Sequence, residues 1–249
     1  MDQFLGKYPK YRADLPENIS RIHKKVYQNN REGVTVAASI SQKMESWLHK
    51  MVAKDVVNSS ANKDTLEIGA GTLNQLEYET GLGAYDICEP FVELYQNKKH
   101  LTKIRYKYKD LSEIPYSNMY DRITSVATLE HILDLPFVIA KSALHLNVNG
   151  KFRASIPSEG SFLWYFGWRF TTGLEFWIKY RLNYKHLIRY EHVNTYKEIN
   201  DVLSFFYKKV NVKVYGISKS ISFYQFYECS MPDLVKCKSY IDLYKNRFE

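Results

Sequence analysis

The sequence predicts an α/β protein whose mostly parallel β-sheet carries helices on both faces. Between residues 65 and 156, short apolar stretches alternate with helix-length segments, which is typical of a parallel sheet. Beyond residue 197, two apolar stretches are separated only by a short Ser-Lys-Ser link, which predicts an antiparallel hairpin. Before residue 64, apolar residues recur at helical spacing, so we expect a helical N-terminal extension.

The N-terminal extension is predicted to hold two helices. Residues 19–27 form a short charged candidate, and residues 36–57 carry apolar side chains at helical spacing, including Ile40, Met44 and Leu48. These helices are expected to cover another part of the molecule.

A polar turn at 58–64 leads into the first strand, 65–68, which ends at Gly69. Further strands are expected at 84–88, 104–108, 122–126 and 152–156, helices at 91–99, 133–146 and 198–209, and hairpin strands at 212–216 and 222–228. Strand 104–108 alternates apolar with basic residues, as an edge strand does when lysine opposes aggregation.

Length and composition indicate a single domain with one sizeable core. The chain has 249 residues, 45% of them hydrophobic and 25% charged. The most apolar stretch, 162–178, is interrupted by Arg169 and Glu175, so it predicts no membrane span. The N-terminus lacks the apolar core of a secretory signal.

The cysteine content also limits the possibilities. Cys88, Cys229 and Cys237 are too few for a disulfide framework or a four-ligand zinc site, so we expect a reducing cytoplasm and no metal. The net charge of +8 favours anionic partners, which include nucleic acid, phosphorylated metabolites and an anionic membrane face.

The most informative motif follows the first strand. Residues 67–74 read Glu-Ile-Gly-Ala-Gly-Thr-Leu-Asn, and glycines there allow a sharp turn and let a ligand lie against the backbone. Asn74 stands where a dinucleotide fingerprint needs glycine or alanine, which weakens an NAD interpretation. Glu89 lies 20 residues after Gly69, where a carboxylate can accept both hydroxyls of a ribose. The pattern predicts a nucleoside site.

Across residues 64–230 the sequence resembles class I S-adenosylmethionine-dependent methyltransferases. The resemblance implies a Rossmann-like seven-stranded sheet with one antiparallel strand, and S-adenosyl-L-methionine as the cofactor. Asp110 resembles the acidic residue that the family directs toward the adenine amino group, and Leu73 replaces a glycine that many members have. The implied cofactor-binding residues are Glu67, Gly69, Ala70, Gly71, Glu89, Pro90, Asp110, Leu111 and Ala127.

We therefore expect residues 1–249 to form a single methyltransferase domain with four parts. It has a helical cap (1–63), a cofactor-binding half (64–157), an aromatic insertion on the acceptor side (158–197), and a last helix, hairpin and tail (198–249).

The implied reaction needs an acceptor aligned with an electrophilic methyl group and, where required, a base. His131, just beyond the fourth strand, is the candidate base; Glu130 is expected to orient a partner, and His192 is a second candidate. The alternative is that the histidines only pack or shape the pocket.

The aromatic insertion and the basic run at 98–109 each have two interpretations. Aromatic residues beside Lys and Arg suit a lid over a substrate or a membrane interface; we favour a lid that also touches lipid headgroups. The basic run suits RNA, but we favour edge-strand protection. The sequence therefore predicts a methyltransferase for a small-molecule or glycan acceptor. The alternatives are an RNA methyltransferase and a non-catalytic cofactor-binding partner.

Overall fold

The computed structural model describes residues 4–12, 15, 38–57, 62–170 and 185–248. The predicted helix at 19–27 lies outside these residues. The helix predicted at 36–57 is present as α2 (Ala38–Ala53).

Seven strands form one sheet in the order β3-β2-β1-β4-β5-β7-β6. Their bounds are β1 (Lys63–Ile68), β2 (Leu82–Cys88), β3 (Lys107–Tyr108), β4 (Tyr120–Val126), β5 (Leu146–Pro157), β6 (Tyr207–Ser218) and β7 (Ile221–Pro232). β7 is antiparallel to both of its neighbours, and the pairings among β1 to β5 are parallel. The predicted seven-stranded sheet with one reversed strand is confirmed.

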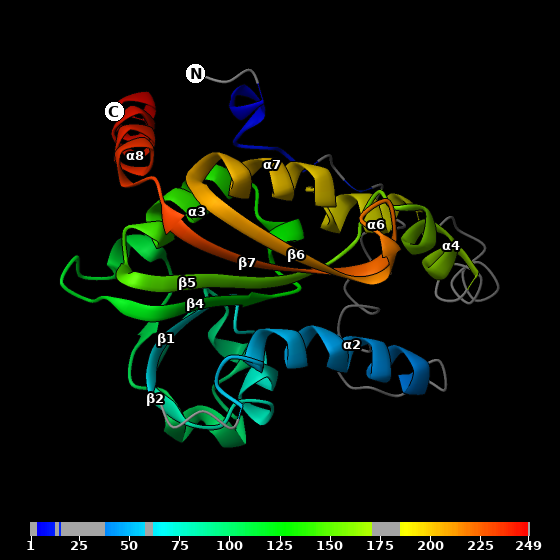
Figure 1. The fold of residues 1–249 in the computed structure, drawn as a ribbon, viewed down its shortest axis with the longest axis horizontal. Coiled ribbons are helices and arrows are strands. Elements are labelled where there is room, and N and C mark those ends of the chain that lie inside the picture. Colours follow the sequence, from blue (N-terminus) through cyan, green and yellow to red (C-terminus); the bar gives the residue numbers. More distant parts are fainter. Residues whose placement is uncertain (1–3, 13–14, 16–37, 58–61, 171–184, 249) are drawn as a thin grey trace.

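Helices cover both faces of this sheet (Figure 1). On one face lie α3 (Leu135–Ala143), α7 (Tyr196–Phe206) and α8 (Leu234–Phe248), and on the other lies α2. The main core forms on the first face, where Leu66, Ile123 and Phe152 of the sheet are buried in one cluster with Ile139 and Leu203 of the helices.

Local sequence explains where two of these helices begin. The Thr195 hydroxyl caps α7 by accepting the Glu198 N–H, and the Glu198 carboxylate accepts the Thr195 N–H in return, which is a capping box. The helix therefore begins two residues before the predicted position 198. Asp134 caps α3 through the Phe137 N–H.

The helix predicted at 91–99 was wrong. The structure has short 3-10 turns there, at Val92–Leu94 and Lys99–Lys103. Tyr95 is buried, but Phe91 and Val92 are 53% and 37% exposed. With Tyr95 alone buried, little packing against the rest of the protein is available to stabilise a regular helix. The predicted strand 104–108 is shortened to the two residues of β3, although its expected place at the sheet edge is confirmed.

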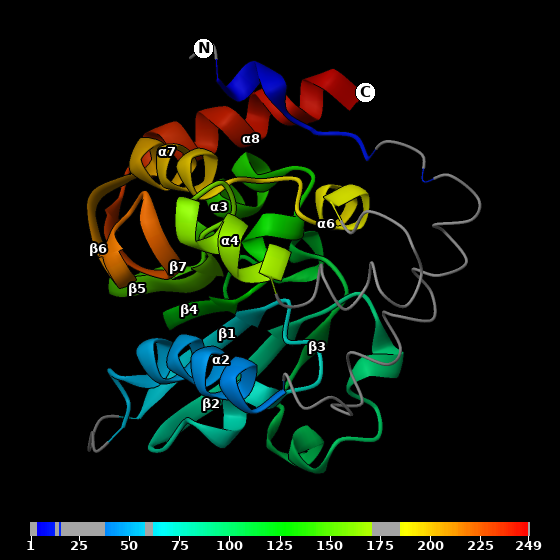
Figure 2. The same ribbon diagram turned by 90° about the vertical axis from the view of Figure 1, so that its right-hand side faces the viewer.

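The aromatic insertion begins with α4 (Phe162–Phe170) and ends with α6 (Lys185–Glu191). Figure 2 shows both helices on the same side of the sheet as α3 and α7. Residues 171–184 lie outside the described residues. In the described part of the chain, no helix combines the length and apolar character that crossing a bilayer requires.

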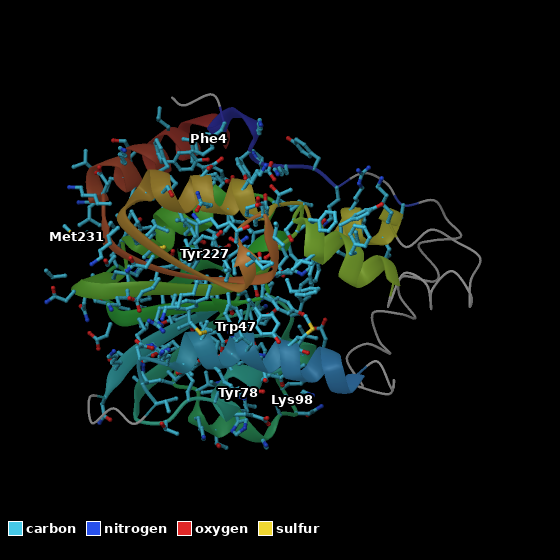
Figure 3. All side chains as sticks on the ribbon, turned by 45° about the vertical axis from the view of Figure 1, so that its right-hand side comes forward. Phe4, Trp47, Tyr78, Lys98, Tyr227 and Met231 are labelled. Atoms are coloured by element: carbon cyan, nitrogen blue, oxygen red, sulfur yellow. The ribbon has the colours of Figure 1, made fainter. Side chains whose placement is uncertain are left out.

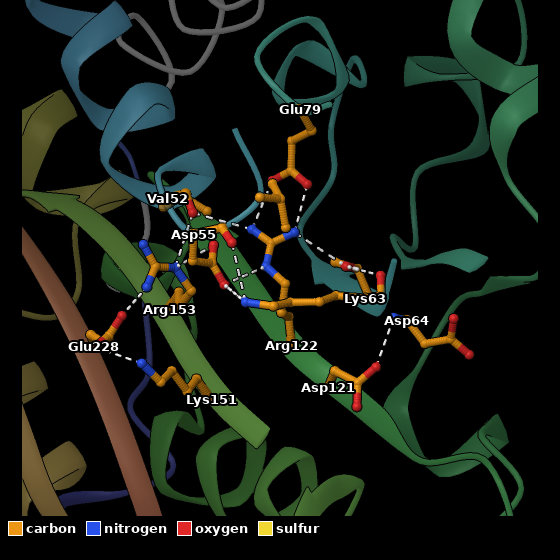
Figure 4. A network of polar contacts seen from close by, with 12 residues as sticks. Val52, Asp55, Lys63, Asp64, Glu79, Asp121, Arg122, Lys151, Arg153 and Glu228 are labelled. Carbon is orange, nitrogen blue, oxygen red and sulfur yellow. Dashed lines mark hydrogen bonds and ion pairs between the residues drawn. The ribbon is translucent and has the colours of Figure 1, made fainter. Parts of the chain in front are cut away.

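Two buried arginines attach α2 to the sheet (Figure 4). Arg122 of β4 is fully buried and makes a bidentate contact with Glu79, at 2.6 and 3.0 Å. Arg153 of β5 contacts Asp55 at 3.1 Å and also binds the carboxylate of Glu228. We call these five residues the arginine clamp.

The arginine clamp also caps the C-terminal end of α2. Arg122 and Arg153 both donate to the carbonyl of Val52, at 3.1 and 3.0 Å, and Arg153 donates to that of Met51 at 2.9 Å. Cations are favourable at a helix C-terminus, where carbonyls lack partners within the helix. The clamp therefore fixes both the position and the end of α2.

Other side chains of α2 reach the sheet and the segment after the glycine motif. The ring of Trp47 lies 5.5 Å from that of Tyr215 on β6, and Figure 3 shows Trp47 between α2 and the sheet. His49 stacks on Tyr78 with ring centres 4.9 Å apart and donates to Gln75 at 2.8 Å. These contacts join α2 to the turn that follows the glycine motif.

We predict that Arg122→Met lowers the free energy of unfolding by about 3 to 5 kcal/mol, because Glu79 is then left buried without its counter-charge. The double variant Arg122→Met/Glu79→Leu should recover most of the loss, as measured by urea denaturation. The control is Lys151→Met, because Lys151 pairs with Glu228 but is 42% exposed. The control should lose less than about 1 kcal/mol. Equal losses in both single variants would contradict the role of the clamp.

Candidate active site

The predicted cofactor residues lie at the carboxyl ends of β1, β2, β3 and β4. The chain passes from β1 outward to β2 and β3 and then returns to β4 on the other side of β1. Ligands of open α/β sheets bind outside the strand ends where the strand order reverses in this way. The glycine motif follows β1 at this position.

Glycine is needed at the two positions of the motif for different physical reasons. Gly69 has a φ of +70°, and a Cβ there would lie 2.2 Å from Cγ2 of Thr128 in the loop after β4. Gly71 has a φ of +49°, but a Cβ there would meet nothing within 4 Å. Gly69 is therefore required by the packing of two loops, whereas Gly71 borders open space in which a ligand can lie against the backbone.

Leu73, where the resemblance implies a glycine in many members, has a left-handed backbone. Its φ is +65°, and its side chain is fully buried. A left-handed conformation costs a non-glycine residue roughly 1 to 2 kcal/mol, and burial of the leucine side chain offsets a cost of that size. The motif continues into a four-residue 3-10 turn, Asn74–Glu77.

Glu89 lies beside the glycine motif, as its predicted role requires. Its buried carboxylate accepts the Gly71 N–H at 2.9 Å and the Phe91 N–H at 3.0 Å. An ionised carboxylate has about four acceptor positions, so two remain for a pair of ribose hydroxyls. The open space at Gly71 and this spare capacity fit an adenosyl group. Pro90, next in the chain, is exposed.

Glu67 is buried at the end of β1 and accepts a hydrogen bond from the Tyr85 hydroxyl at 2.8 Å. Burial raises the pKa of Glu67 to about 8, although the Tyr85 hydrogen bond opposes this shift. The carboxyl is therefore mainly protonated at neutral pH. A ligand with a positive charge near Glu67 would favour its ionised form.

The remaining predicted cofactor residues differ in exposure. Asp110 is exposed and accepts both the N–H and the hydroxyl of Ser112, at 2.7 and 2.6 Å. Leu111 and Ala70 are buried. Ala127 is exposed and has a left-handed backbone with a φ of +48°. Backbone strain in a loop at strand ends is common at ligand sites.

The three predicted catalytic residues come together. Glu130 and His131 lie in a 3-10 turn after β4, and His192 follows α6. Nε2 of His131 is 3.7 Å from Oε1 of Glu130, and the two imidazole ring centres are 4.9 Å apart. We call these residues the Glu-His-His cluster.

The hydrogen bonds of the Glu-His-His cluster fix the histidine tautomers. Nδ1 of His131 is 2.9 Å from the Glu191 carbonyl, which can only accept, so this nitrogen carries a proton. In the neutral ring, the lone pair is then on Nε2. Nδ1 of His192 is 3.1 Å from the Glu159 carboxylate. Burial lowers the pKa of His192, but Glu159 and Glu130 outweigh it, so the net shift is upward. Burial raises the pKa of Glu130.

Sequence reasoning missed two residues that build this cluster. The Glu159 carboxylate accepts hydrogen bonds from Nδ1 of His192 and, at 2.5 Å, from the indole N–H of Trp164. Its position directly after the fifth strand was an available signal, because carboxyl ends of parallel strands share one edge. Asn194 is fully buried and donates to the carbonyls of Leu129 and Ile132. No sequence pattern marked it.

The N-terminal segment also reaches the Glu-His-His cluster. Lys10 donates to the Val193 carbonyl at 2.8 Å and pairs with Glu198 at 2.6 Å. Arg12 donates to the His131 carbonyl at 3.2 Å. Segments far apart in the sequence therefore border the same site.

No protein-family model matches the chain. Over 139 residues it is 24% identical to malonyl-[acyl-carrier protein] O-methyltransferase of Bacillus cereus, a match that covers 52% of this chain and 51% of the relative. Over 119 residues it is 25% identical to the enzyme of the same name from Bacillus cytotoxicus, covering 45% and 41%. The chain spans about half the length of the curated relatives it matches.

Solved structures agree on the architecture. The plantazolicin methyltransferase BpumL in complex with SAH aligns with a TM-score of 0.54 at 11% identity, covering 92% of this chain and 94% of BpumL. The chain has the Rossmann-like methyltransferase fold. The N-methyltransferase NodS of Bradyrhizobium japonicum, in complex with S-adenosyl-L-homocysteine, aligns at 0.52 with 11% identity, covering 77% of this chain and 87% of NodS. CurJ carbon methyltransferase aligns at 0.51 with 20% identity, covering 74% and 54%.

Within this methyltransferase fold, we predict that Glu67 makes stability depend on pH. The pKa of Glu67 is about 8 in the folded state, against an ordinary value of 4.5. The protonated carboxyl therefore makes its full contribution to the free energy of unfolding below about pH 4.5. That contribution is lost as the pH rises to about 8. Glu67→Gln should therefore gain stability relative to the wild type between about pH 5 and pH 8 in urea denaturation.

The control is Glu77→Gln. The hydrogen bond from Lys99 lowers the pKa of this exposed carboxyl, so its effect is confined to acid pH. A constant difference between wild type and Glu67→Gln across the range would contradict the prediction.

Proposed function

We propose that this protein transfers a methyl group from S-adenosyl-L-methionine to a small-molecule or glycan acceptor. The observation that carries the proposal is the meeting of Gly71, open to a ligand, with the Glu89 carboxylate at the switch point of a methyltransferase fold. When bound, the cofactor supplies a sulfonium methyl that is already electrophilic. The protein's tasks are to bind, to align the acceptor and to exclude water.

On the cofactor side, each proposed role follows from position. Glu89 accepts the ribose hydroxyls, and the backbone at 69–71 lies along the methionine part. Asp110, held by Ser112, has an oxygen left for the adenine amino group. Glu67 lies where its carboxyl can respond to the positive charge of the cofactor.

We assign contact with the acceptor to the Glu-His-His cluster. His131 is 36% exposed at its side chain, so an acceptor can reach it, and its Nε2 has a lone pair that can receive a proton. Glu130 and His192 lie close enough to orient the acceptor or His131.

The cap (1–63) and the aromatic insertion (158–197) are proposed to enclose the acceptor. Arg12 of the cap touches His131, and Trp164 of the insertion stacks on His192 with ring centres 6.1 Å apart. Phe162, Tyr165 and Phe166 of α4 are 40 to 60% exposed. They suit a lid whose outer face touches lipid headgroups. Three buried free cysteines support a cytoplasmic location. The exposed aromatic residues of α4 support contact with a membrane surface.

The names of the relatives support an acceptor other than nucleic acid. The acceptors in these names are malonyl-[acyl-carrier protein] and plantazolicin. Incubation with the cofactor and a panel of small-molecule, glycan and RNA acceptors, followed by mass spectrometry, tests the proposal. A mass gain of one CH2 unit on a small molecule or glycan supports it. Methylation of RNA alone favours the RNA alternative, and cofactor binding with no turnover favours a non-catalytic partner.

We predict that Glu89→Ala weakens S-adenosylhomocysteine binding by about 1.5 to 3 kcal/mol, because hydrogen bonds to a charged group are lost. Glu89→Gln is the matched variant, since the amide oxygen still accepts one bond, and its loss should be smaller. Asp110→Ala should also lose less, because one amino contact is removed. Isothermal calorimetry measures all three. An unchanged Glu89→Ala, or a larger loss in Asp110→Ala, would reverse the assignment.

We predict that His131→Ala lowers turnover at least tenfold and leaves the affinity for S-adenosylhomocysteine within about twofold, because His131 acts on the acceptor. His100→Ala, which alters a histidine on the 3-10 turn at Lys99–Lys103, is the control and should keep both values. Equal turnover in the two variants would reduce His131 to a packing role.

A further inference from the structure

We infer that the Glu-His-His cluster binds a divalent first-row transition-metal cation. The sequence predicts no metal site, because its three cysteines are too few for four-ligand zinc coordination. The fold instead brings together two imidazoles and one carboxylate from two separate segments. One ligand atom of each residue lies within 4.8 Å of the others.

The distances allow a cation after a small adjustment. Ligand atoms at about 2.1 Å from one metal lie roughly 3 to 3.5 Å apart, so the cluster must close by about 1 Å. Side-chain rotation suffices for such a change because the backbone is already fixed. The Glu130 carbonyl accepts the N–H groups of both Val193 and Asn194, at 2.8 and 3.0 Å. These bonds join the segment of Glu130 and His131 to that of His192.

The partners outside the cluster are those of metal-bound histidines. Such a histidine donates its second ring nitrogen to a backbone carbonyl or a carboxylate, which fixes the tautomer and turns the other nitrogen toward the metal. His131 has the carbonyl of Glu191 in this role, and His192 has the carboxylate of Glu159. In their neutral forms, both rings therefore present Nε2 as the nitrogen that can bind a metal.

Glu130 supplies an independent observation. Its side chain is 1% exposed, and its Oε2 has no hydrogen-bond partner among the described residues. Its Oε1 is 3.7 Å from Nε2 of His131, which is too long for a hydrogen bond. A buried carboxylate oxygen without a partner is costly, and a bound cation would satisfy it.

The ligand types indicate the class of cation. Two imidazoles with one carboxylate suit Zn²⁺, Fe²⁺, Co²⁺ or Mn²⁺, whereas Mg²⁺ and Ca²⁺ prefer oxygen ligands. Three protein ligands leave at least one position for an oxygen of the acceptor. The cation's role, though not its binding, rests on the proposed function. It would hold that oxygen beside the methyl group and ease loss of its proton to water, in place of His131 as base.

Cobalt binding tests the inference without an activity assay. Untagged protein is stripped with a chelator and titrated with Co²⁺, and visible absorption and elemental analysis report the site. We expect one Co²⁺ per chain, with the spectrum of nitrogen and oxygen ligands. A thiolate charge-transfer band would instead place the metal at a cysteine and overturn the inference.

Variants place the metal at the cluster. Glu130→Gln, His131→Gln and His192→Gln should each weaken Co²⁺ binding at least tenfold, and His100→Gln should not change it. Glu159→Gln should weaken it about 10- to 100-fold through His192. Circular dichroism checks that each variant is folded. If the cluster variants do not fold, the wild-type stoichiometry and spectrum decide the question alone.

The same samples separate this inference from the proposed function. Calorimetry with S-adenosylhomocysteine is run beside each Co²⁺ titration. Nucleoside binding without bound Co²⁺, or Co²⁺ affinity unchanged in all three cluster variants, overturns the metal site and leaves the proposed function standing. Co²⁺ binding that depends on the cluster, without nucleoside binding, supports the metal site and overturns the proposed function.

Discussion

The burial of two arginines against the end of one helix is the constraint on which the arrangement depends. Arg122 and Arg153 come from adjacent strands, and both donate to the last carbonyls of α2 while they pair with acids. Neither a lone buried arginine nor a lone buried carboxylate is tolerable in such a place. The strands, the helix end and the acids therefore have to be assembled together.

This constraint extends to the ligand side of the sheet. α2 is held by the arginine clamp, and its His49 binds Gln75 in the turn after the glycine motif. On the opposite side, the glycine motif is pressed against the loop after β4, where Gly69 leaves room for only a hydrogen atom beside Thr128. The motif is thus fixed from two directions, while the space at Gly71 stays open.

The arrangement of the Glu-His-His cluster suits both of the roles proposed for it. A carbonyl or carboxylate that holds one ring nitrogen of a histidine leaves the other with a lone pair. That lone pair accepts a proton from an acceptor or binds a cation, and it cannot do both at once. Which use prevails depends on whether Glu130 remains without a partner or shares a metal with the histidines.

Local patterns in the sequence were enough to predict most of the strands along the chain, the edge position of 104–108, and where the glycine motif and Glu89 fall. They are strand periodicity, alternating lysines, glycine at sharp turns and a fixed interval to the next strand end. The helix predicted after Glu89 did not form, because Phe91, Leu94 and Tyr95 have helical spacing but only Tyr95 is buried. Glu67, Glu130, His131 and His192 were named from the sequence, but their environments were not. Three features arise only when distant segments pack together: Glu67 is buried, His192 contacts Glu159, and Asn194 joins two segments far apart in the chain. Burial and proximity between residues far apart in the chain arise from packing, which no local pattern encodes.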